Sequence, residues 1–208
     1  PESVSTAEGA LCEPLSVGIH ACRRGSVGTG DTVLITGAGP IGLMVLEAAR
    51  AAGATDVILT DVVDEKLAFA EKRGADLAVN VAETDLDAAV AEYTDGVGAD
   101  VVVEASGAEP SIKSTIDVVR RGGTVVLVGL ASEAEVPIDV LELIDNEVDV
   151  HGSFRYKNTY DAAVDLLADG EVDVEGIIDF QSELEDIDDA FRRAMEPTVV
   201  KGMISLDS

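Results

Sequence analysis

Short apolar runs alternate with amphipathic segments along most of this chain. The runs carry Val, Ile and Leu at almost every position, and we interpret them as strands at 32–36, 56–60, 77–80, 100–105, 124–129 and 148–153. Because odd and even positions are both apolar, both faces of the sheet are expected to be covered. The intervening segments have helical spacing and predict helices near 43–50, 64–73, 85–94, 110–120 and 137–144.

This alternation of strands and helices predicts parallel pairing in a doubly wound α/β fold. Six strands in two halves predict the order 3-2-1-4-5-6, with the sixth strand at an edge of the sheet. A ligand is expected over the carboxyl ends of strands 1 and 4.

The two ends of the chain differ from this repeat. From Ser5 to about residue 25, apolar positions suggest a helix interrupted by Pro14. The tail predicts a helix at 158–169, a short strand at 177–180, a helix at 185–195 and a strand at 201–206.

The composition is strongly acidic. Asp and Glu number 41 against 14 Lys and Arg, for a formal net charge of −27. Such a surface repels nucleic acid and anionic lipid, and spread acids of this density resemble the surfaces of proteins from salt-loving organisms. With two cysteines, no apolar run of 18 residues and no leader at its start, the chain is expected to be cytoplasmic, with no membrane partner.

A glycine motif follows the first strand. Gly37, Gly39 and Gly42 have the spacing G-x-G-x-x-G between a strand and a helix. This order is typical of a dinucleotide-binding Rossmann fold, in which the helix N-terminus receives the pyrophosphate. A tight turn that binds nothing is the alternative, because the motif by itself is weak evidence.

Asp61 supports the dinucleotide interpretation. It ends the second strand 19 residues after Gly42, where a carboxylate accepts hydrogen bonds from ribose hydroxyls and repels a 2′-phosphate, which favours NAD over NADP. The alternative is an acid that only caps the following turn. Lys66 either lies along the adenosine or is an ordinary solvated helix charge.

Small or exposed residues end the later strands at the same edge. They are Ser106 with Gly107 after strand 4, Val128 to Leu130 after strand 5, and Phe154, Arg155 and Tyr156 after strand 6. They suit the nicotinamide half of a cofactor. The alternatives are ordinary strand-ending turns and, for Arg155, a local ion pair, although the position of Arg155 favours a ligand role. Taken alone, Glu13 is a helix acid and Cys12, Cys22 and His20 are structural residues.

Several segments together resemble the medium-chain, zinc-dependent alcohol dehydrogenases, and in particular the polyol branch with sorbitol and xylitol dehydrogenases. The resemblance rests on five segments: 8–25, with Cys-Glu-Pro at 12–14; the loop 37–42; Glu-Ala-Ser-Gly-Ala-Glu at 104–109; Gly-Gly at 122–123; and 147–156 with Asn-Thr at 158–159, which is the most diagnostic. It covers essentially the whole chain.

The resemblance implies a role for individual residues. Glu13 matches an acid that contacts the catalytic zinc or its water, and Arg155 and Tyr156 match residues that reach the polyol. The residues that match NAD contacts or the phosphate loop are Gly37, Gly39, Pro40, Ile41, Gly42, Asp61, Lys66, Ser106, Val128, Gly129, Leu130, Ser153, Phe154 and Arg155. In such enzymes zinc polarises an alcohol oxygen and hydride passes to nicotinamide.

The other zinc ligands of that family have no counterpart here. We therefore expect residues 1–20 to dock on a catalytic domain outside this sequence, 21–171 to bind NAD, and 172–208 to return toward that domain, with zinc bound only in the full-length enzyme. The expected substrate is a polyol or secondary alcohol, and the expected assembly is a homodimer or homotetramer. The alternatives are a stand-alone dinucleotide-sensing module and, more weakly, a methyltransferase.

Overall fold

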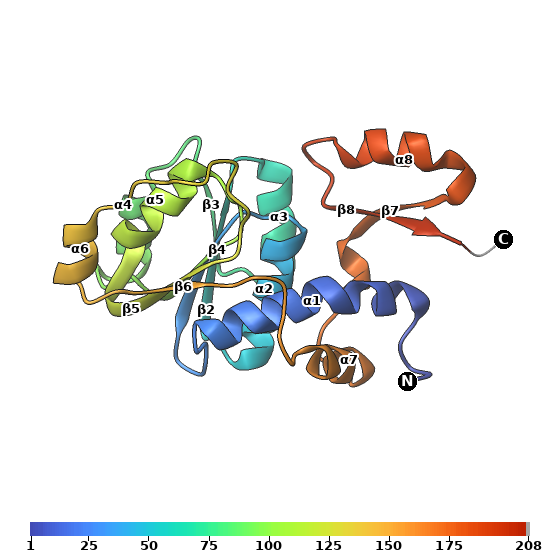
Figure 1. Ribbon diagram of the computed structural model, residues 1–208, viewed down its shortest axis with the longest axis horizontal. Helices are drawn as coiled ribbons and strands as arrows, with labels where there is room; N and C mark the ends of the chain where they lie inside the picture. Colours follow the sequence, from blue (N-terminus) through green and yellow to red (C-terminus); the bar gives the residue numbers. More distant parts are fainter. Residues whose placement is uncertain (207–208) are drawn as a thin grey trace.

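A parallel six-stranded sheet with helices on both faces forms the larger part of the molecule in this computed structural model, which describes residues 1–206 (Figure 1). The strand order is β3-β2-β1-β4-β5-β6, as predicted. The strands are β1 (Thr32–Thr36), β2 (Asp56–Asp61), β3 (Leu77–Asn80), β4 (Ala99–Glu104), β5 (Val119–Leu127) and β6 (Asp149–Gly152). The chain crosses between the two halves of the sheet from β3 to β4, so β1 and β4 are neighbours.

The strands β1 to β5 contribute to two buried layers, whereas β6 contributes to neither. Val33 and Ile35 of β1 pack with one cluster, whereas Leu34 between them packs with the other. The helices on the first face are α1 (Thr6–Arg24), α2 (Pro40–Ala52), α3 (Asp64–Lys72) and α7 (Tyr160–Ala168), and those on the second are α4 (Leu86–Tyr93), α5 (Glu109–Val118) and α6 (Val140–Asp145). This double coverage explains why the strands are apolar at successive positions.

Helix α1 is continuous, so the predicted interruption at Pro14 is wrong. Ser5 caps the helix, with its Oγ accepting from the Glu8 amide and the Glu8 carboxylate accepting from the Ser5 amide. Proline removes one helical hydrogen bond, at a cost of about 3 kcal/mol in a helix interior. Pro14 is itself buried, and the apolar face from Leu11 to Cys22 packs on α2 and α7, which offsets that cost.

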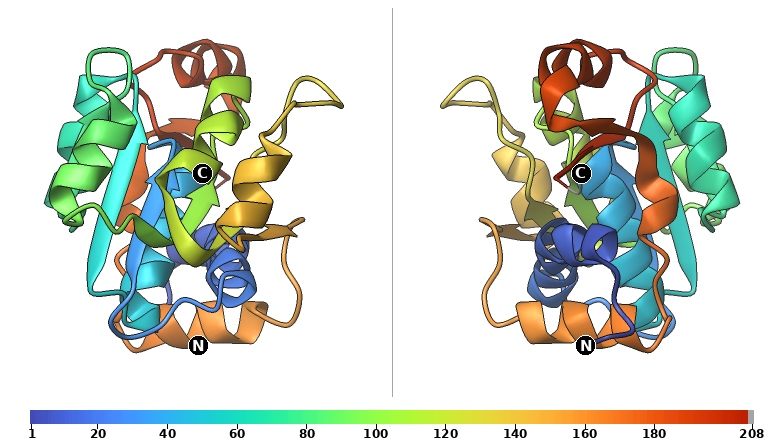
Figure 2. Two further views of the ribbon diagram at one scale, coloured as in Figure 1. Left: turned by 90° about the vertical axis from the view of Figure 1, so that its left-hand side faces the viewer. Right: turned by 90° about the vertical axis from the view of Figure 1, so that its right-hand side faces the viewer.

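Strand β5 begins five residues earlier than predicted. Ala99 pairs with Val119 and Val101 pairs with Thr124, so the register shifts and residues 120–123 form a bulge. The glycines that suggested a turn before the strand lie within this bulge, where Gly122 has φ +65°. The predicted helix 110–120 correspondingly ends at Val118. After β5, the loop 131–139 projects from the body of the molecule (Figure 2).

The tail forms a separate small unit at one end of the molecule (Figure 1). It consists of η1 (Glu175–Ile177), β7 (Ile178–Glu183), η2 (Leu184–Asp186), α8 (Ile187–Ala194) and β8 (Lys201–Ser205), and β7 pairs in parallel with β8. The strands β7 and β8 and the helix α8 confirm the prediction, whereas the short helical turns η1 and η2 were not predicted. The last two residues of the predicted 172–208 segment lie outside the described part. No helix within residues 1–206 has both the length and the apolar composition needed to cross a bilayer.

Candidate functional site

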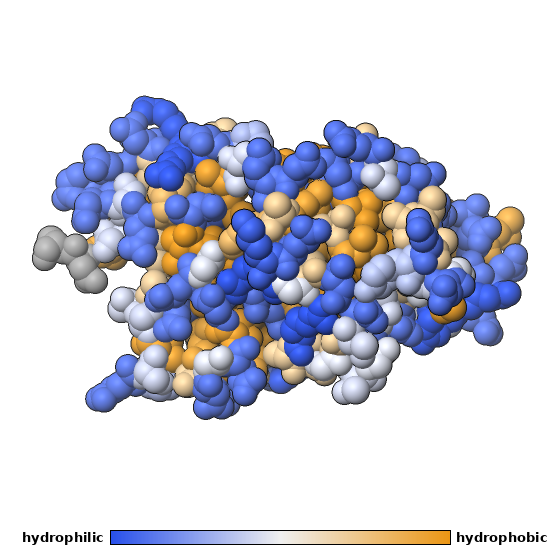
Figure 3. Space-filling view, turned by 180° about the vertical axis from the view of Figure 1, so that it is seen from behind, coloured by the Kyte–Doolittle hydropathy of each residue, from blue (hydrophilic) through white to orange (hydrophobic). Residues whose placement is uncertain are grey.

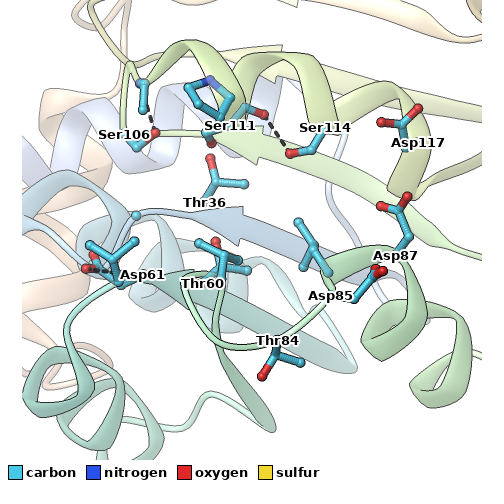
Figure 4. Close-up of a pocket in the computed structure, with 16 residues that line it drawn as sticks. Thr36, Thr60, Asp61, Thr84, Asp85, Asp87, Ser106, Ser111, Ser114 and Asp117 are labelled. Atoms are coloured by element: carbon cyan, nitrogen blue, oxygen red, sulfur yellow. Dashed lines mark hydrogen bonds between the residues drawn. The ribbon is translucent and has the colours of Figure 1, made fainter.

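A cavity of about 610 Å³ lies at the carboxyl ends of β1, β2 and β4. In Figure 4, Asp61 lies toward one end of this cavity, Asp87 and Asp117 lie toward the other, and Ser106, Ser111 and Ser114 follow one wall. The lining residues come from five segments: Thr36–Gly37, Thr60–Val62, Val81 with Thr84–Asp87, Ser106 with Ala108, and Pro110 with Ser111, Ser114 and Asp117. The cavity is therefore at the predicted edge of the sheet.

The glycine loop has the geometry that its sequence requires. Gly37 has φ +94°, which lets the chain leave β1 sharply. A Cβ at Gly42 would overlap the Gly37 carbonyl oxygen, so only glycine allows α2 to begin this close to the strand. A Cβ at Gly39, in contrast, would meet no other atom within 4 Å. Gly39 directly precedes the N-terminus of α2. This space can receive a phosphate at the positive end of the helix dipole, so the loop fits a dinucleotide.

Asp61 lines the cavity and is held by backbone groups. Its Oδ2 accepts from the Ala38 amide at 2.7 Å, and its Oδ1 accepts from the amides of Val62 and Val63 at 2.8 and 3.1 Å. The turn-capping alternative is therefore observed. A carboxylate has about four acceptor positions, so these three bonds leave capacity for a further donor. Lys66 lies in the first turns of α3 and is half-buried.

The predicted nicotinamide contacts lie beside the cavity. Ser106 lines it, whereas Val128, Gly129 and Leu130 follow β5 and Ser153, Phe154 and Arg155 follow β6, along the same carboxyl edge but outside the cavity lining. Ile41, Pro40 and Gly39 form the start of α2. The structure thus brings together Gly37, Asp61 and Ser106 around one cavity, whereas the remaining predicted residues do not line it.

Arg155 and Tyr156 lie on a segment that runs along α1. Arg24 donates to the Gly152 carbonyl at 3.1 Å and Arg23 donates to the Asn158 carbonyl at 2.7 Å, so α1 holds both ends of this segment. The Arg155 guanidinium carbon lies 5.5 Å from the centroid of the Phe154 ring. The backbone of Arg155 is in the left-handed region, with φ +53°.

Tyr156 packs on Tyr160, with ring centroids 5.9 Å apart. Glu13 is exposed on α1. None of Glu13, Arg155 and Tyr156 lines the cavity.

The sequence analysis did not predict the part of the cavity wall that is formed by the segment after β3 and by α5. Thr84, Asp85 and Asp87 follow the end of β3, where the rule that found Asp61 also applies. Ser111, Ser114 and Asp117 lie on α5, and no local signal places them at a site. Burial raises the pKa of Asp87, and the negative charge of Asp85 raises it further. Burial also raises the pKa of Asp117, and the charge of Asp87 is the largest of the acidic contributions to that shift.

A metal site does not form from the described residues. Among residues 1–206, no group of three or more His, Cys, Asp and Glu side chains has a geometry that could hold a metal ion. Glu13 by itself therefore does not form a zinc site.

Comparison with known proteins gives relatives of one kind. Sorbitol dehydrogenase of Bacillus subtilis (strain 168) is 42% identical over 196 residues, covering 94% of this chain and 56% of that protein. The structure of 2R,3R-butanediol dehydrogenase from Bacillus subtilis matches with a TM-score of 0.92 and 30% identity, over 100% of this chain and 60% of that one. A Sinorhizobium meliloti 1021 protein bound to NADP matches with a TM-score of 0.93 and 32% identity, over 99% and 61%.

The chain thus spans about 60% of the length of these relatives. The zinc-binding dehydrogenase family model matches residues 40–169, which is more than half of the 208 residues and includes the end of the glycine loop from Pro40 to Gly42, Asp61 and the β4–β6 strand ends. Because this match agrees with the strand order and with the full-length fold similarity, the chain belongs to the zinc-binding dehydrogenase family.

Proposed function

We propose that this chain is the NAD-binding portion of a zinc-dependent polyol or secondary-alcohol dehydrogenase. The observation that carries the proposal is the cavity at the ends of β1, β2 and β4, with the open Gly39 at one helix N-terminus and Asp61 beside it. A dinucleotide needs both a phosphate site and a ribose acceptor, and these two features supply them.

Different residues of this chain would bind different parts of the cofactor. Backbone amides at the start of α2 would bind the pyrophosphate, and Asp61 would accept from the adenosine ribose while its charge repels a 2′-phosphate. Ser106, Val128 to Leu130 and Ser153 to Arg155 would border the nicotinamide. When bound, NAD supplies the carbon that accepts hydride from the alcohol.

The substrate side would be completed outside this sequence. The relatives named above include a sorbitol dehydrogenase and a 2R,3R-butanediol dehydrogenase, and the chain covers only part of their length. Glu13, Arg155 and Tyr156 would meet the alcohol and the water on zinc, with the metal's remaining ligands supplied by the catalytic domain. The stand-alone sensing module is less favoured, since it gives these three residues no task.

An apolar surface on the tail unit supports docking of that catalytic domain. Leu184, Phe191 and Met195 are each more than half exposed. In Figure 3, apolar surface gathers on the part of the molecule that carries the tail unit. Uncovered apolar patches of this kind mark protein contacts.

Two measurements test the function. Calorimetric titration of the 208-residue chain in molar salt should give NAD binding, and the chain alone should not oxidise a polyol. The same assay on a longer protein containing the catalytic domain should give zinc- and NAD-dependent oxidation. Failure of the chain to bind NAD would refute the cofactor role, and turnover by the chain alone would refute the division of the active site.

We also propose that the chain assembles as a dimer or tetramer through its sheet edge. β6 is an edge strand, with Val150 exposed, and the neighbouring α6 exposes Leu141 and Ile144. Light scattering in high salt should give at least twice the monomer mass. If the longer protein that contains the catalytic domain is strictly monomeric, this assignment is wrong.

The net charge of −27 suggests a protein of a salt-rich cytoplasm. Salt shortens the Debye length from about 10 Å at 0.1 M to about 3 Å at 1 M, which screens the repulsion among these acids. The melting temperature should therefore rise steadily as KCl increases over this range. A flat or falling curve would argue against this adaptation.

A further inference from the structure

Glu104, at the last position of β4, is the buried acid at the centre of the strand ends. Its side chain is completely buried, and its Oε1 is within hydrogen-bond distance of five donor groups. They are the Thr36 hydroxyl at 3.3 Å, the Ser106 amide at 3.0 Å and hydroxyl at 2.5 Å, the Gly107 amide at 2.9 Å and the Ser111 hydroxyl at 3.1 Å. One oxygen thus joins the end of β1, the turn after β4 and the start of α5.

The same residue holds the turn after β5 through its backbone. The Glu104 carbonyl accepts from the amides of Val128 and Gly129, both at 2.9 Å. The two turns also touch directly. A Cβ at Gly107 would overlap the Leu130 carbonyl oxygen, and a Cβ at Gly129 would overlap the Gly107 amide nitrogen. The turns after β4 and β5 therefore form one close-packed pair with Glu104 beneath it.

The second carboxylate oxygen has no partner. Glu104 Oε2 is one of two buried side-chain oxygens in the described residues without a hydrogen bond, and a Cβ at Gly129 would lie 2.5 Å from it. A buried acceptor without a donor costs about 1–3 kcal/mol. An apolar residue here would remove that cost but would leave the five donor groups of Oε1 without their acceptor, so the acid is what holds the turn after β4 in place.

We propose that Glu104 is a positioning residue for the nicotinamide half of the cofactor. This inference rests on the proposed NAD function, in which that half lies against the Ser106 and Gly129 turns. Glu104 does not touch the cofactor in this role. It fixes the two turns at one spacing, so the nicotinamide wall is already formed before binding. The adenosine half would lie against Asp61 at the end of β2 and the adjoining Val62, and the Asp61 side chain bonds to backbone amides rather than to Glu104.

The test compares NAD with AMP, which has only the adenosine half. In E104Q, the amide keeps the shape of the side chain but loses the charge that strengthens the hydrogen bonds to Oε1. The expected result is an NAD affinity about tenfold weaker with an AMP affinity within about twofold of wild type, measured by calorimetry on the 208-residue chain. Equal weakening of both ligands, or no change in either, would overturn the inference.

Val103→Ala is the matched control. Val103 is the preceding residue of β4, equally buried, but it packs into the layer on the other face of the sheet. It should lower the melting temperature while leaving the ratio of NAD to AMP affinity unchanged. A change of that ratio in Val103→Ala equal to the change in E104Q would assign the effect to strand stability and overturn the role of Glu104.

A second variant keeps the test decisive if E104Q does not fold. Ser111→Ala removes one donor from Oε1, and it should weaken NAD severalfold without affecting AMP. Equal loss for both ligands would contradict the proposal. If E104Q folds, Ser111→Ala added to it should cause no further loss, because Ser111 acts through Glu104. Wild-type protein that binds neither ligand would refute the NAD function itself, whereas normal NAD binding with an unchanged ratio in E104Q refutes only this inference.

Discussion

The Asp61 carboxylate accepts a hydrogen bond of 2.7 Å from the Ala38 amide, which joins the end of β2 to the glycine loop that follows β1. This bond fixes the separation between the two features that a dinucleotide requires, the phosphate loop and the ribose acceptor. The acid therefore has two tasks, one in the fold and one proposed for the ligand, and a substitution must be chosen to separate them.

Asp61→Asn should relax cofactor choice. The amide keeps an oxygen for the Val62 and Val63 amides, but it loses both the acceptor for the Ala38 amide and the negative charge that would repel a 2′-phosphate. We expect the affinity for NADP relative to NAD to rise about tenfold, which is about 1.4 kcal/mol. Titration of both cofactors measures the ratio. Asp95 is an exposed acid with φ +52° outside the cavity, so Asp95→Asn is the charge control and should leave the ratio of NADP to NAD affinity unchanged. An unchanged ratio in Asp61→Asn would show that the ribose role is wrong.

Gly18→Ala should destabilise the protein by about 1–3 kcal/mol or more, through overpacking. Its Cβ would overlap the Met44 carbonyl oxygen and lie 2.7 Å from the Met44 carbonyl carbon, where α1 crosses α2. Gly9 is the matched control in the same helix, because its Cβ would meet nothing within 4 Å. Gly9→Ala should therefore stabilise by about 0.5–1 kcal/mol. Urea unfolding gives both values, and equal effects would contradict the close approach of the helices.

Arg73→Ala should cost about 3–5 kcal/mol, because it leaves a largely buried carboxylate without its partner. The Arg73 guanidinium pairs with Glu47 of α2, through Nε at 2.8 Å, and with Asp173 before η1, at 3.0 Å. Both Arg73 and Glu47 are mostly buried, whereas Asp173 is exposed. Burial raises the pKa of Glu47, as expected for an acid that is hard to ionise there.

Asp173→Ala is the comparison for that prediction. It removes an exposed partner and should cost about 1 kcal/mol or less. Urea unfolding at neutral pH measures both variants. A cost for Asp173→Ala as large as that for Arg73→Ala would contradict the importance of burial in this pair.

Ionisation of Tyr93 should lower the free energy of unfolding at high pH. Burial and the hydrogen bond from its hydroxyl to Asp56 at 2.9 Å raise the pKa of Tyr93 to about 12. The folded state therefore holds this proton more tightly than the unfolded state, whose tyrosine has a pKa of about 10. The resulting stability is complete below about pH 10 and is lost between about pH 10 and 12.

Tyr93→Phe should flatten the fall in unfolding free energy across this pH range. Absorbance titration should also lose its last tyrosine ionisation in this variant. Asp56→Ala keeps the phenol but removes its acceptor, so the ionisation should move to lower pH. A Tyr93→Phe variant whose stability falls as steeply as wild type would show that other groups cause the loss.

Most of the fold was predictable because its signals are local. Buried strands between two helical layers must be apolar at successive positions, and the strand–helix alternation then leaves few topologies. The shape of the glycine loop was predictable for a similar reason, since Gly37 and Gly42 meet steric demands set within six residues. The outcome at Pro14 was different, because packing of α1 against two other helices offset a local penalty that the sequence displays.

The sequence by itself determined the strand order, the glycine loop and the acid at the end of β2, since each follows from neighbouring residues or from the period of burial. Only the tertiary structure decided that Glu104 lies beneath two turns and that Ser111 and Asp117 form a wall of the cavity. These residues meet others from separate strands and helices, through hydrogen bonds and close backbone contacts that have no spacing along the chain. A buried acid becomes recognisable as a central group only when its donors are brought together in space.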